Sequence, residues 1–204
     1  TCGKGVYAAP VAEHALMLGL AGLRGLGHYA RADGWTGQRG VNLLGARVTI
    51  VGGGGIAESL LRLLAPFGTT TTVVRRHPAP MPGAQHVLGA DGLHESLPGA
   101  TLVVLALPLV PETVGLVGRP ELALMDEDAW LVNVARGKVC DELAVTAALS
   151  AKMIAGAALD VTAEEPLAAD SPLWAMPHVI VTPHSAGETV RYEDRVIDLL
   201  IENV

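Results

Sequence analysis

Four consecutive glycines follow a β-branched apolar run, and this junction constrains the fold more than any other stretch of the chain. Residues 47–51 (Arg-Val-Thr-Ile-Val) suit a buried strand, and residues 56–67 repeat apolar side chains at helical spacing. Between them, Gly52, Gly54 and Ala57 occupy the three small-residue positions of a Gly-x-Gly-x-x-Gly/Ala turn. The junction predicts a strand, a phosphate-binding turn and a helix, with a flexible poly-glycine loop as the alternative.

The helix expected after this turn completes the predicted phosphate site. The first N–H groups of a helix have no partner within the helix, and the helix dipole places positive charge at that end. An anion against the turn is stabilised by both. We therefore expect Gly52, Gly54, Gly55 and Ile56 to contact the phosphates of a dinucleotide.

Apolar runs recur along the chain at intervals that leave room for helices. Residues 102–107 (Leu-Val-Val-Leu-Ala-Leu) show no polar alternation, as expected for a parallel strand covered on both faces. Further strands are expected at 69–74, 86–88, 130–134, 154–159 and 178–181, helices at 10–26, 93–97, 121–125, 141–150 and 187–204, and a connector at 27–42. This order predicts an α/β fold, a doubly wound parallel sheet of the Rossmann type that binds a dinucleotide.

Composition and charge exclude several classes of partner. The net charge is −7 and aromatic residues make up 3% of the 204-residue chain, so neither a basic surface for nucleic acid nor base-stacking rings are expected. The longest uncharged apolar runs, near 15–23 and 102–110, fall short of the roughly 18–20 residues that cross a membrane. Cys2 and Cys140 fit neither a metal site nor a disulfide framework, which favours a cytoplasmic protein without a metal centre.

In open α/β sheets, ligands bind beyond the carboxyl ends of the strands. The segments expected at that edge are the glycine turn, Arg75–Arg76, Leu107–Pro108, Asn133–Gly137, Asp160 and Thr182–His184. Arg136, His184 and Glu165 together could bind a carboxylate, transfer a proton and stabilise the protonated state of the group that transfers it. Taken singly, Arg136 could be a solvated loop residue, His184 could cap the last helix, and Glu164 could take the place of Glu165.

Several segments share the order of one family's motifs. They are 12–15 (Ala-Glu-His-Ala), 107–109 (Leu-Pro-Leu) with 111–113 (Pro-Glu-Thr), 133–137 (Asn-Val-Ala-Arg-Gly), 159–161 (Leu-Asp-Val) with 164–166 (Glu-Glu-Pro), and 182–187 (Thr-Pro-His-Ser-Ala-Gly). Through them, nearly the whole chain resembles the D-isomer-specific 2-hydroxyacid dehydrogenases. It departs from the family at Val110, where the family usually has Thr, and after the strand expected at 69–74.

The resemblance implies roles for four polar residues. Arg136 would bind the substrate carboxylate and polarise the keto oxygen, since a guanidinium fork fits a planar carboxylate. His184 would protonate the keto oxygen, and Glu165 would orient the imidazole and stabilise its protonated form. Asp160 would accept a hydrogen bond from the nicotinamide carboxamide. Besides the glycine turn, the implied cofactor contacts are Leu107, Pro108, Val134, Ala135, Arg136, Asp160, His184, Ala186 and Gly187, whereas His28, His77, His86, His94 and His178 are expected to be structural.

The resemblance also predicts how the chain is divided. Residues 1–40 would form an interlobe helix and connector, residues 41–186 the dinucleotide-binding core, and residues 187–204 the start of a helix that returns to a second lobe, which would be missing. The family's interlobe helix packs across a dimer axis, which implies a homodimer. Its small, apolar face here, which a helix buried within one chain would also show, consists of Ala15, Leu16, Gly19, Ala21 and Gly22.

The implied reaction is hydride transfer between a nicotinamide cofactor and a small 2-keto acid, giving a D-2-hydroxy acid. Glyoxylate/hydroxypyruvate reductases and phosphoglycerate dehydrogenases are the models. A non-catalytic, dinucleotide-sensing corepressor of the same fold is one alternative. A formate dehydrogenase is another, although that class has Gln where this chain has Glu165. A purely structural domain is the third.

The residues after the second expected strand predict which dinucleotide binds. An NAD-selective site places an acidic residue there, about 20 residues after the glycine turn, to bind the ribose 2′-OH. No acidic residue lies between Glu58 and Asp91, and Arg75 and Arg76 occupy the position instead. Because Arg pairs well with a phosphate dianion, the sequence predicts a preference for NADP, with NAD as a possible cofactor. Two ordinary solvated charges are the alternative.

Overall fold

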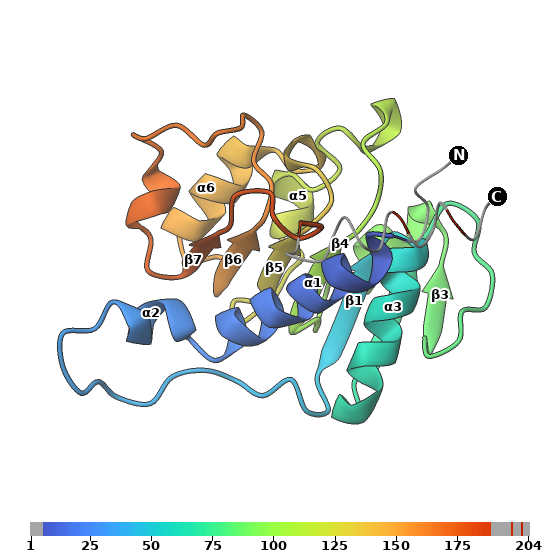
Figure 1. Ribbon diagram of the computed structural model, residues 1–204, viewed down its shortest axis with the longest axis horizontal. Coiled ribbons are helices and arrows are strands. Elements are labelled where there is room, and N and C mark those ends of the chain that lie inside the picture. Colours follow the sequence, from blue (N-terminus) through green and yellow to red (C-terminus); the bar gives the residue numbers. More distant parts are fainter. Residues whose placement is uncertain (1–5, 189–196, 198–200, 202–204) are drawn as a thin grey trace.

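The computed structural model describes residues 6–188, Ile197 and Ile201. Within this part of the chain, seven parallel strands form one sheet in the order β3-β2-β1-β4-β5-β6-β7 (Figure 1). The strands are β1 (Arg47–Val51), β2 (Thr70–Val74), β3 (His86–Leu88), β4 (Leu102–Leu105), β5 (Trp130–Asn133), β6 (Gly156–Leu159) and β7 (Val179–Val181). The helices are α1 (Ala8–Leu23), α2 (Leu26–Ala30), α3 (Gly55–Leu64), α4 (Leu93–Ser96), α5 (Arg119–Leu122) and α6 (Glu142–Ser150). The strand order runs outward in both directions from β1 and β4, which confirms the predicted doubly wound Rossmann-type sheet.

The central strands are buried on both faces. Ile50 of β1 lies opposite Val73 of β2 and Val104 of β4 in the parallel register. Along β4, Val104 belongs to the apolar layer under α1 and α3, whereas Val103 and Leu105 belong to the layer on the opposite face. Two buried faces explain why these strands show no polar alternation in the sequence.

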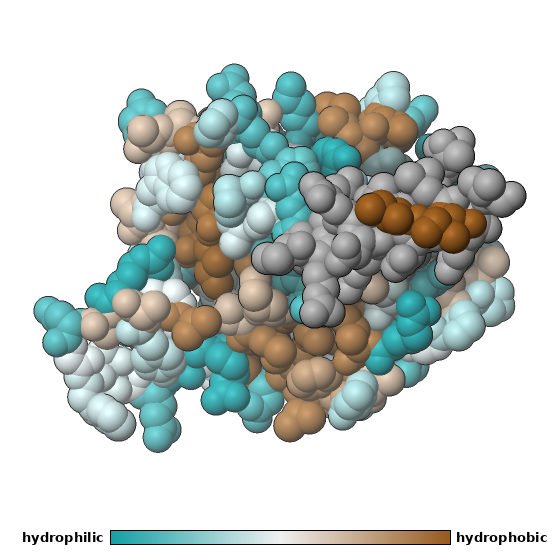
Figure 2. All heavy atoms as spheres, in the orientation of Figure 1, coloured by the Kyte–Doolittle hydropathy of each residue, from teal (hydrophilic) through white to brown (hydrophobic). Residues whose placement is uncertain are grey.

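Helices cover both faces of the sheet (Figure 1). On one face, Leu18 of α1 and Leu60 of α3 are buried, and on the other, Leu122 of α5 and Leu149 of α6 are buried. Each such side chain contributes about 1.5–3 kcal/mol by leaving water. On the face shown in Figure 2, hydrophobic residues reach the surface in several separate places between hydrophilic ones. No helix in the described part of the chain is long and apolar enough to span a membrane.

Some predicted boundaries are wrong by a few residues, for identifiable reasons. The helix predicted from 121 begins at Arg119, because the Glu121 carboxylate reaches back and accepts a hydrogen bond from the Gly118 N–H (2.9 Å), as an N3 residue does in a capping box. The predicted connector contains most of α2. The helical path is interrupted at the left-handed Gly25 (φ 66°), and α2 begins after it and continues through Gly27. The strand predicted over 102–107 ends at Leu105, where the chain leaves the sheet toward Pro108.

The small-residue face of α1 packs within the chain. A Cβ on Gly19 would press on Leu102 of β4, and a Cβ on Gly22 would overlap the indole of Trp130 in β5. These two glycines therefore allow α1 to lie close against the sheet, which supports the intrachain alternative for this face. Homodimer formation stays a prediction.

Most of the helix predicted at 187–204 lies outside the described residues. The described positions in this range are 187, 188, Ile197 and Ile201, and the two isoleucines are helical and exposed. All seven described strands fall within residues 41–186, and α1 packs on the same sheet. The division of the chain at residues 40 and 186 stays a prediction.

Candidate active site

The glycine turn connects the end of β1 to the start of α3. Gly52 adopts φ 118°, and a Cβ there would overlap the carbonyl group of Ala106, so a larger residue does not fit. A Cβ on Gly54, in contrast, would meet open space. No side chain of the described residues caps the N-terminus of α3, so the N–H groups that begin at Gly55 are free for a ligand. The turn therefore fits a phosphate group.

A cavity of about 450 Å³ lies beside the turn. Its lining includes Gly52, Gly53, Arg75, Arg76, Leu107, Pro108 and Glu112. A Cβ on Gly53 would contact the side chain of Arg75, so this half-buried guanidinium lies directly over the turn, whereas Arg76 is exposed. Neither arginine forms an ion pair with a carboxylate in the part of the chain that the structure describes. The cavity thus offers two guanidinium groups to a negatively charged ligand.

The loop after β5 presents Arg136. Buried Asn133 shapes this loop, since its side-chain oxygen accepts from the Ala135 N–H (3.0 Å) and its amide nitrogen donates to the Arg136 carbonyl (3.2 Å). Val134 and Ala135 are buried, whereas the Arg136 side chain is exposed and donates from Nη1 to the Ala135 carbonyl (2.6 Å). The guanidinium keeps further donors for a carboxylate.

Asp160, at the end of β6, ties three elements together. It is 2% exposed. Its Oδ1 accepts from the Thr182 hydroxyl (2.6 Å) and the Ser185 N–H (3.0 Å), and its Oδ2 accepts from the Ala186 N–H (3.0 Å). His14 of α1 places Nε2 3.3 Å from Asp160 Oδ1 and 3.1 Å from the Thr182 hydroxyl. One carboxylate therefore connects α1 and the loop after β7 to the end of β6.

These contacts determine the charge of Asp160. Burial alone would raise its pKa, but the hydrogen bonds from His14, Thr182 and the two backbone N–H groups lower the pKa to about 2. The group is therefore ionised at neutral pH. Both of its oxygens already have partners within the protein, so a cofactor amide that approached it would share Oδ2 with the Ala186 N–H.

His184 and Glu165 form a pair at the same edge of the sheet. His184 Nδ1 lies 2.7 Å from Glu165 Oε2, and the two side chains are 44% and 38% exposed. His184 has a left-handed backbone (φ 54°), held by donation from its N–H to the Asp160 carbonyl (2.8 Å). Glu165 Oε1 accepts from the Thr162 N–H (3.1 Å), which fixes the carboxylate. The pair uses Glu165 and not Glu164, and it leaves His184 Nε2 without a protein partner among the described residues.

The sequence did not predict the roles of two residues whose hydrogen bonds fix loops at this edge of the sheet. It gave no role to His14, which entered only as part of the 12–15 segment shared with the family, or to the side chain of Asn133, which shapes the Arg136 loop. Of the other predicted contacts, Ile56 lies in the first turn of α3, and a Cβ on Gly187 would contact the Tyr7 ring.

A comparison with models of protein families identifies the family of this chain. The model of the D-isomer specific 2-hydroxyacid dehydrogenase NAD binding domain matches residues 14–186. The chain belongs to this family. The matched range contains the glycine turn, Arg136, Asp160, Glu165 and His184.

Individual relatives agree with the family. The chain is 32% identical over 157 residues to glyoxylate/hydroxypyruvate reductase A of Yersinia enterocolitica, a match that covers 77% of this chain and 50% of that protein. It is 34% identical over 198 residues to D-3-phosphoglycerate dehydrogenase of Mycobacterium leprae, covering 95% of this chain and 37% of that one. The crystal structure of a D-isomer specific 2-hydroxyacid dehydrogenase from Xanthobacter autotrophicus in complex with NADPH and MES superposes with a TM-score of 0.87 at 34% identity, over 98% of this chain and 83% of that one. The chain thus spans half or less of the length of these two curated relatives.

Proposed function

We propose that this chain carries the cofactor-binding and proton-transfer parts of an enzyme that uses NADPH to reduce a small 2-keto acid to a D-2-hydroxy acid. The observation that carries the proposal is the His184–Glu165 pair, 2.7 Å apart, at the same edge of the sheet as the glycine turn. In this pair the imidazole would donate the proton and the carboxylate would orient the imidazole, at the edge where the glycine turn would bind a dinucleotide.

The cofactor would lie along the carboxyl edge of the sheet. The N-terminus of α3 and the open space at Gly54 would hold the pyrophosphate, and Leu107 and Pro108 would line the adenosine side. Arg75 or Arg76 would pair with the 2′-phosphate of NADP, because no acidic residue of this segment can accept from a ribose 2′-OH. The bound nicotinamide supplies the hydride.

The side chains of the protein would bind the keto acid and deliver the proton. The exposed Arg136 guanidinium would bind the carboxylate of the substrate through two parallel hydrogen bonds, which fixes its orientation. His184 Nε2, which faces away from Glu165, would donate its proton to the keto oxygen. Glu165 would hold the ring so that Nδ1 carries the other proton. In oxidation of the hydroxy acid, the same nitrogen would accept the proton.

The relatives guide the choice of test substrates, since their names include glyoxylate/hydroxypyruvate reductase and D-3-phosphoglycerate dehydrogenase. NADPH oxidation would be followed by the loss of the reduced nicotinamide absorbance with glyoxylate, hydroxypyruvate, 3-phosphohydroxypyruvate, pyruvate and branched 2-keto acids. We expect sustained turnover with at least one of them by a full-length protein that includes the second lobe, and poor turnover by the 204-residue chain alone. Cofactor binding by the full-length protein without turnover on the whole panel would instead identify a dinucleotide sensor. A homodimer and a cytoplasmic location stay predictions from the sequence.

A further inference from the structure

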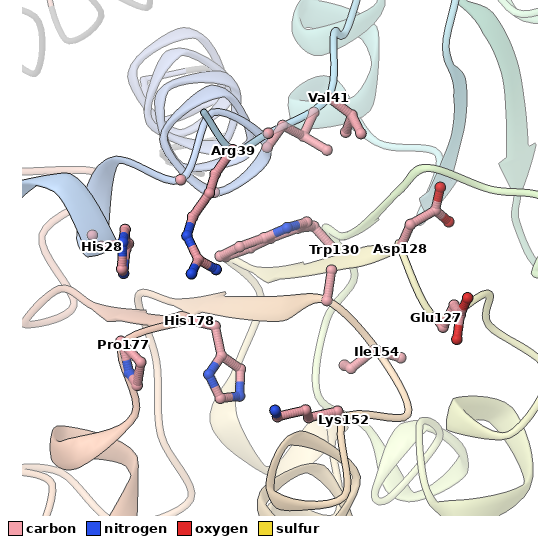
Figure 3. Close-up of a pocket in the computed structure, with 16 residues that line it drawn as sticks. His28, Arg39, Val41, Glu127, Asp128, Trp130, Lys152, Ile154, Pro177 and His178 are labelled. Carbon is pink, nitrogen blue, oxygen red and sulfur yellow. The ribbon is translucent and has the colours of Figure 1, made fainter. Parts of the chain in front are cut away.

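A second cavity, of about 500 Å³, lies at the opposite edge of the sheet (Figure 3). Its lining includes Trp130 at the start of β5, Ile154 just before β6 and His178 just before β7, together with residues around the end of α1 and Val41 of the connector. All strands are parallel, so this is the amino edge, one strand length (about 15 Å) from the proposed cofactor site. The volume is in the range of small-molecule sites.

Four basic side chains converge on this amino-edge cavity from separate elements. Figure 3 shows His28 of α2, Arg39 of the connector, Lys152 after α6 and His178 before β7 around one common space. Arg39 and Lys152 form no ion pair with a carboxylate in the described part of the chain. The convergence is notable in a protein with 14 Lys and Arg against 21 Asp and Glu.

Backbone hydrogen bonds fix the two segments that carry Lys152 and Arg39. Lys152 and His184 are the two non-glycine residues of the described chain with a positive φ, 55° and 54°. Lys152 is the C′ residue of a Schellman motif that ends α6, since its N–H donates to the Leu149 carbonyl (3.1 Å) and the Met153 N–H donates to the Ala148 carbonyl (2.9 Å). The N–H of Arg39 donates to the Tyr29 hydroxyl (2.6 Å), and the Val41 N–H donates to the Leu23 carbonyl (2.8 Å), so the connector is fixed on both sides of the cavity.

The charged residues of the cavity are separated, with basic residues at one end and acidic residues at the other. Figure 3 shows Glu127 and Asp128 at the end away from His28, with Trp130 and Ile154 between the two ends. An anionic group is attracted to the basic end and repelled from the acidic end, while the middle offers apolar contact. His178 Nε2 donates to the Leu149 carbonyl (3.2 Å), so Nδ1 is the nitrogen left for a ligand, and it donates to an oxyanion in the protonated ring.

From this arrangement we propose that the amino-edge cavity binds a small molecule with one oxyanion head group, a phosphate or a carboxylate, and an apolar body. Arg39, Lys152 and His178 bind the head group, and the body lies against Trp130 and Ile154. Because the cavity is a strand length from the glycine turn, its ligand and the dinucleotide bind at the same time. The proposal does not rest on the proposed reaction.

Calorimetric titration of the chain with phenyl phosphate, phenylacetate and inorganic phosphate tests this site. We expect one binding event for phenyl phosphate or phenylacetate, at least about tenfold tighter than for inorganic phosphate, because the ring buries apolar area. The stronger of the two ring-bearing probes identifies the preferred head group. Absence of binding by both of them would overturn the proposal.

Variants locate the binding event. Arg39→Gln and Lys152→Asn should each weaken the ring-bearing probe at least about tenfold, as expected for a lost charge-assisted hydrogen bond, and Asn tolerates the left-handed backbone at 152. The matched control Arg62→Gln removes an exposed charge on α3 and should leave binding unchanged. Thermal melts of each variant show that the fold is intact. Binding that is lost in Arg76→Gln but kept in Arg39→Gln would place the probe in the cofactor cavity and contradict the proposal.

Discussion

The two edges of the sheet are built differently although the same strands end at both. At the carboxyl edge, each candidate group lies in a short loop directly after a strand, and the loop after β7 is fixed to the buried carboxylate of Asp160. At the amino edge, the basic groups come from α2, the connector, the end of α6 and the segment before β7. A site of the first kind can be predicted from the sequence, because each group directly follows a strand. A site of the second kind can be recognised only in the folded structure, because its groups come from unrelated elements.

Both edges share one physical feature. Each has a left-handed residue with an ionisable side chain, His184 at one edge and Lys152, which ends α6 in a Schellman motif, at the other. At the carboxyl edge the left-handed backbone is held by hydrogen bonds to Asp160 and Thr182, whose carbonyl groups accept from the His184 N–H. The comparison predicts that substitutions at the carboxyl edge change turnover, and that similar substitutions at the amino edge do not.

The largest expected effect is on turnover at the carboxyl edge. In the full-length protein, His184→Asn removes the proposed proton donor but keeps a residue that tolerates a positive φ, so kcat should fall at least about 100-fold with little change in stability. The control His86→Asn makes the same change at an exposed position at the amino end of β3 and should leave kcat unchanged. Steady-state kinetics and thermal melts measure both. Near-wild-type turnover by His184→Asn would remove this imidazole from the mechanism.

A smaller effect is expected on stability in acid. The pKa of Asp160 is lowered from 3.8 to about 2 in the folded chain, so the ionised carboxylate stabilises the fold above pH 4 and this contribution is lost as the pH falls through 2. The contribution is about 2 kcal/mol in the free energy of unfolding. Asp160→Asn should reduce stability at neutral pH and flatten its acid dependence, as followed by urea unfolding at several pH values. An unchanged acid dependence would contradict the ionised, hydrogen-bonded state of Asp160.

The smallest effect concerns one hydroxyl group. Thr182→Val keeps the shape of the side chain but removes the donor to Asp160 Oδ1 (2.6 Å) and the contact with His14. Unfolding free energy should fall by about 1 kcal/mol, and kcat should fall modestly because the loop that carries His184 loosens. The variant Thr146→Val, in α6, is the matched control and should change kcat little. A kcat equal to wild type in Thr182→Val would show that Asp160 holds the loop without this hydroxyl.

The sequence was most informative where chemistry and local structure coincide. The glycine turn, the ends of β1 and β3, and the Asp141 cap of α6 follow from local rules about glycine, β-branched runs and capping side chains. The pairing of His184 with Glu165 and not Glu164 could not be derived, because it depends on how the loop after β6 folds back. His14 and the four basic groups of the amino edge are far apart in the chain, and only the packing of α1, α2 and the connector on the sheet brings them to their partners.

The central claim is that the carboxyl edge binds a dinucleotide through its 2′-phosphate. The most direct test is to measure dissociation constants of NADPH and NADH for the chain by fluorescence, in the wild type and in Arg75→Ala and Arg76→Ala. We predict that the wild type binds NADPH more tightly than NADH. In one of the two variants, the affinity for NADPH should fall roughly 10- to 100-fold while the affinity for NADH is almost unchanged, as expected for a lost charge-assisted pair. Equal or tighter binding of NADH by the wild type would contradict the account.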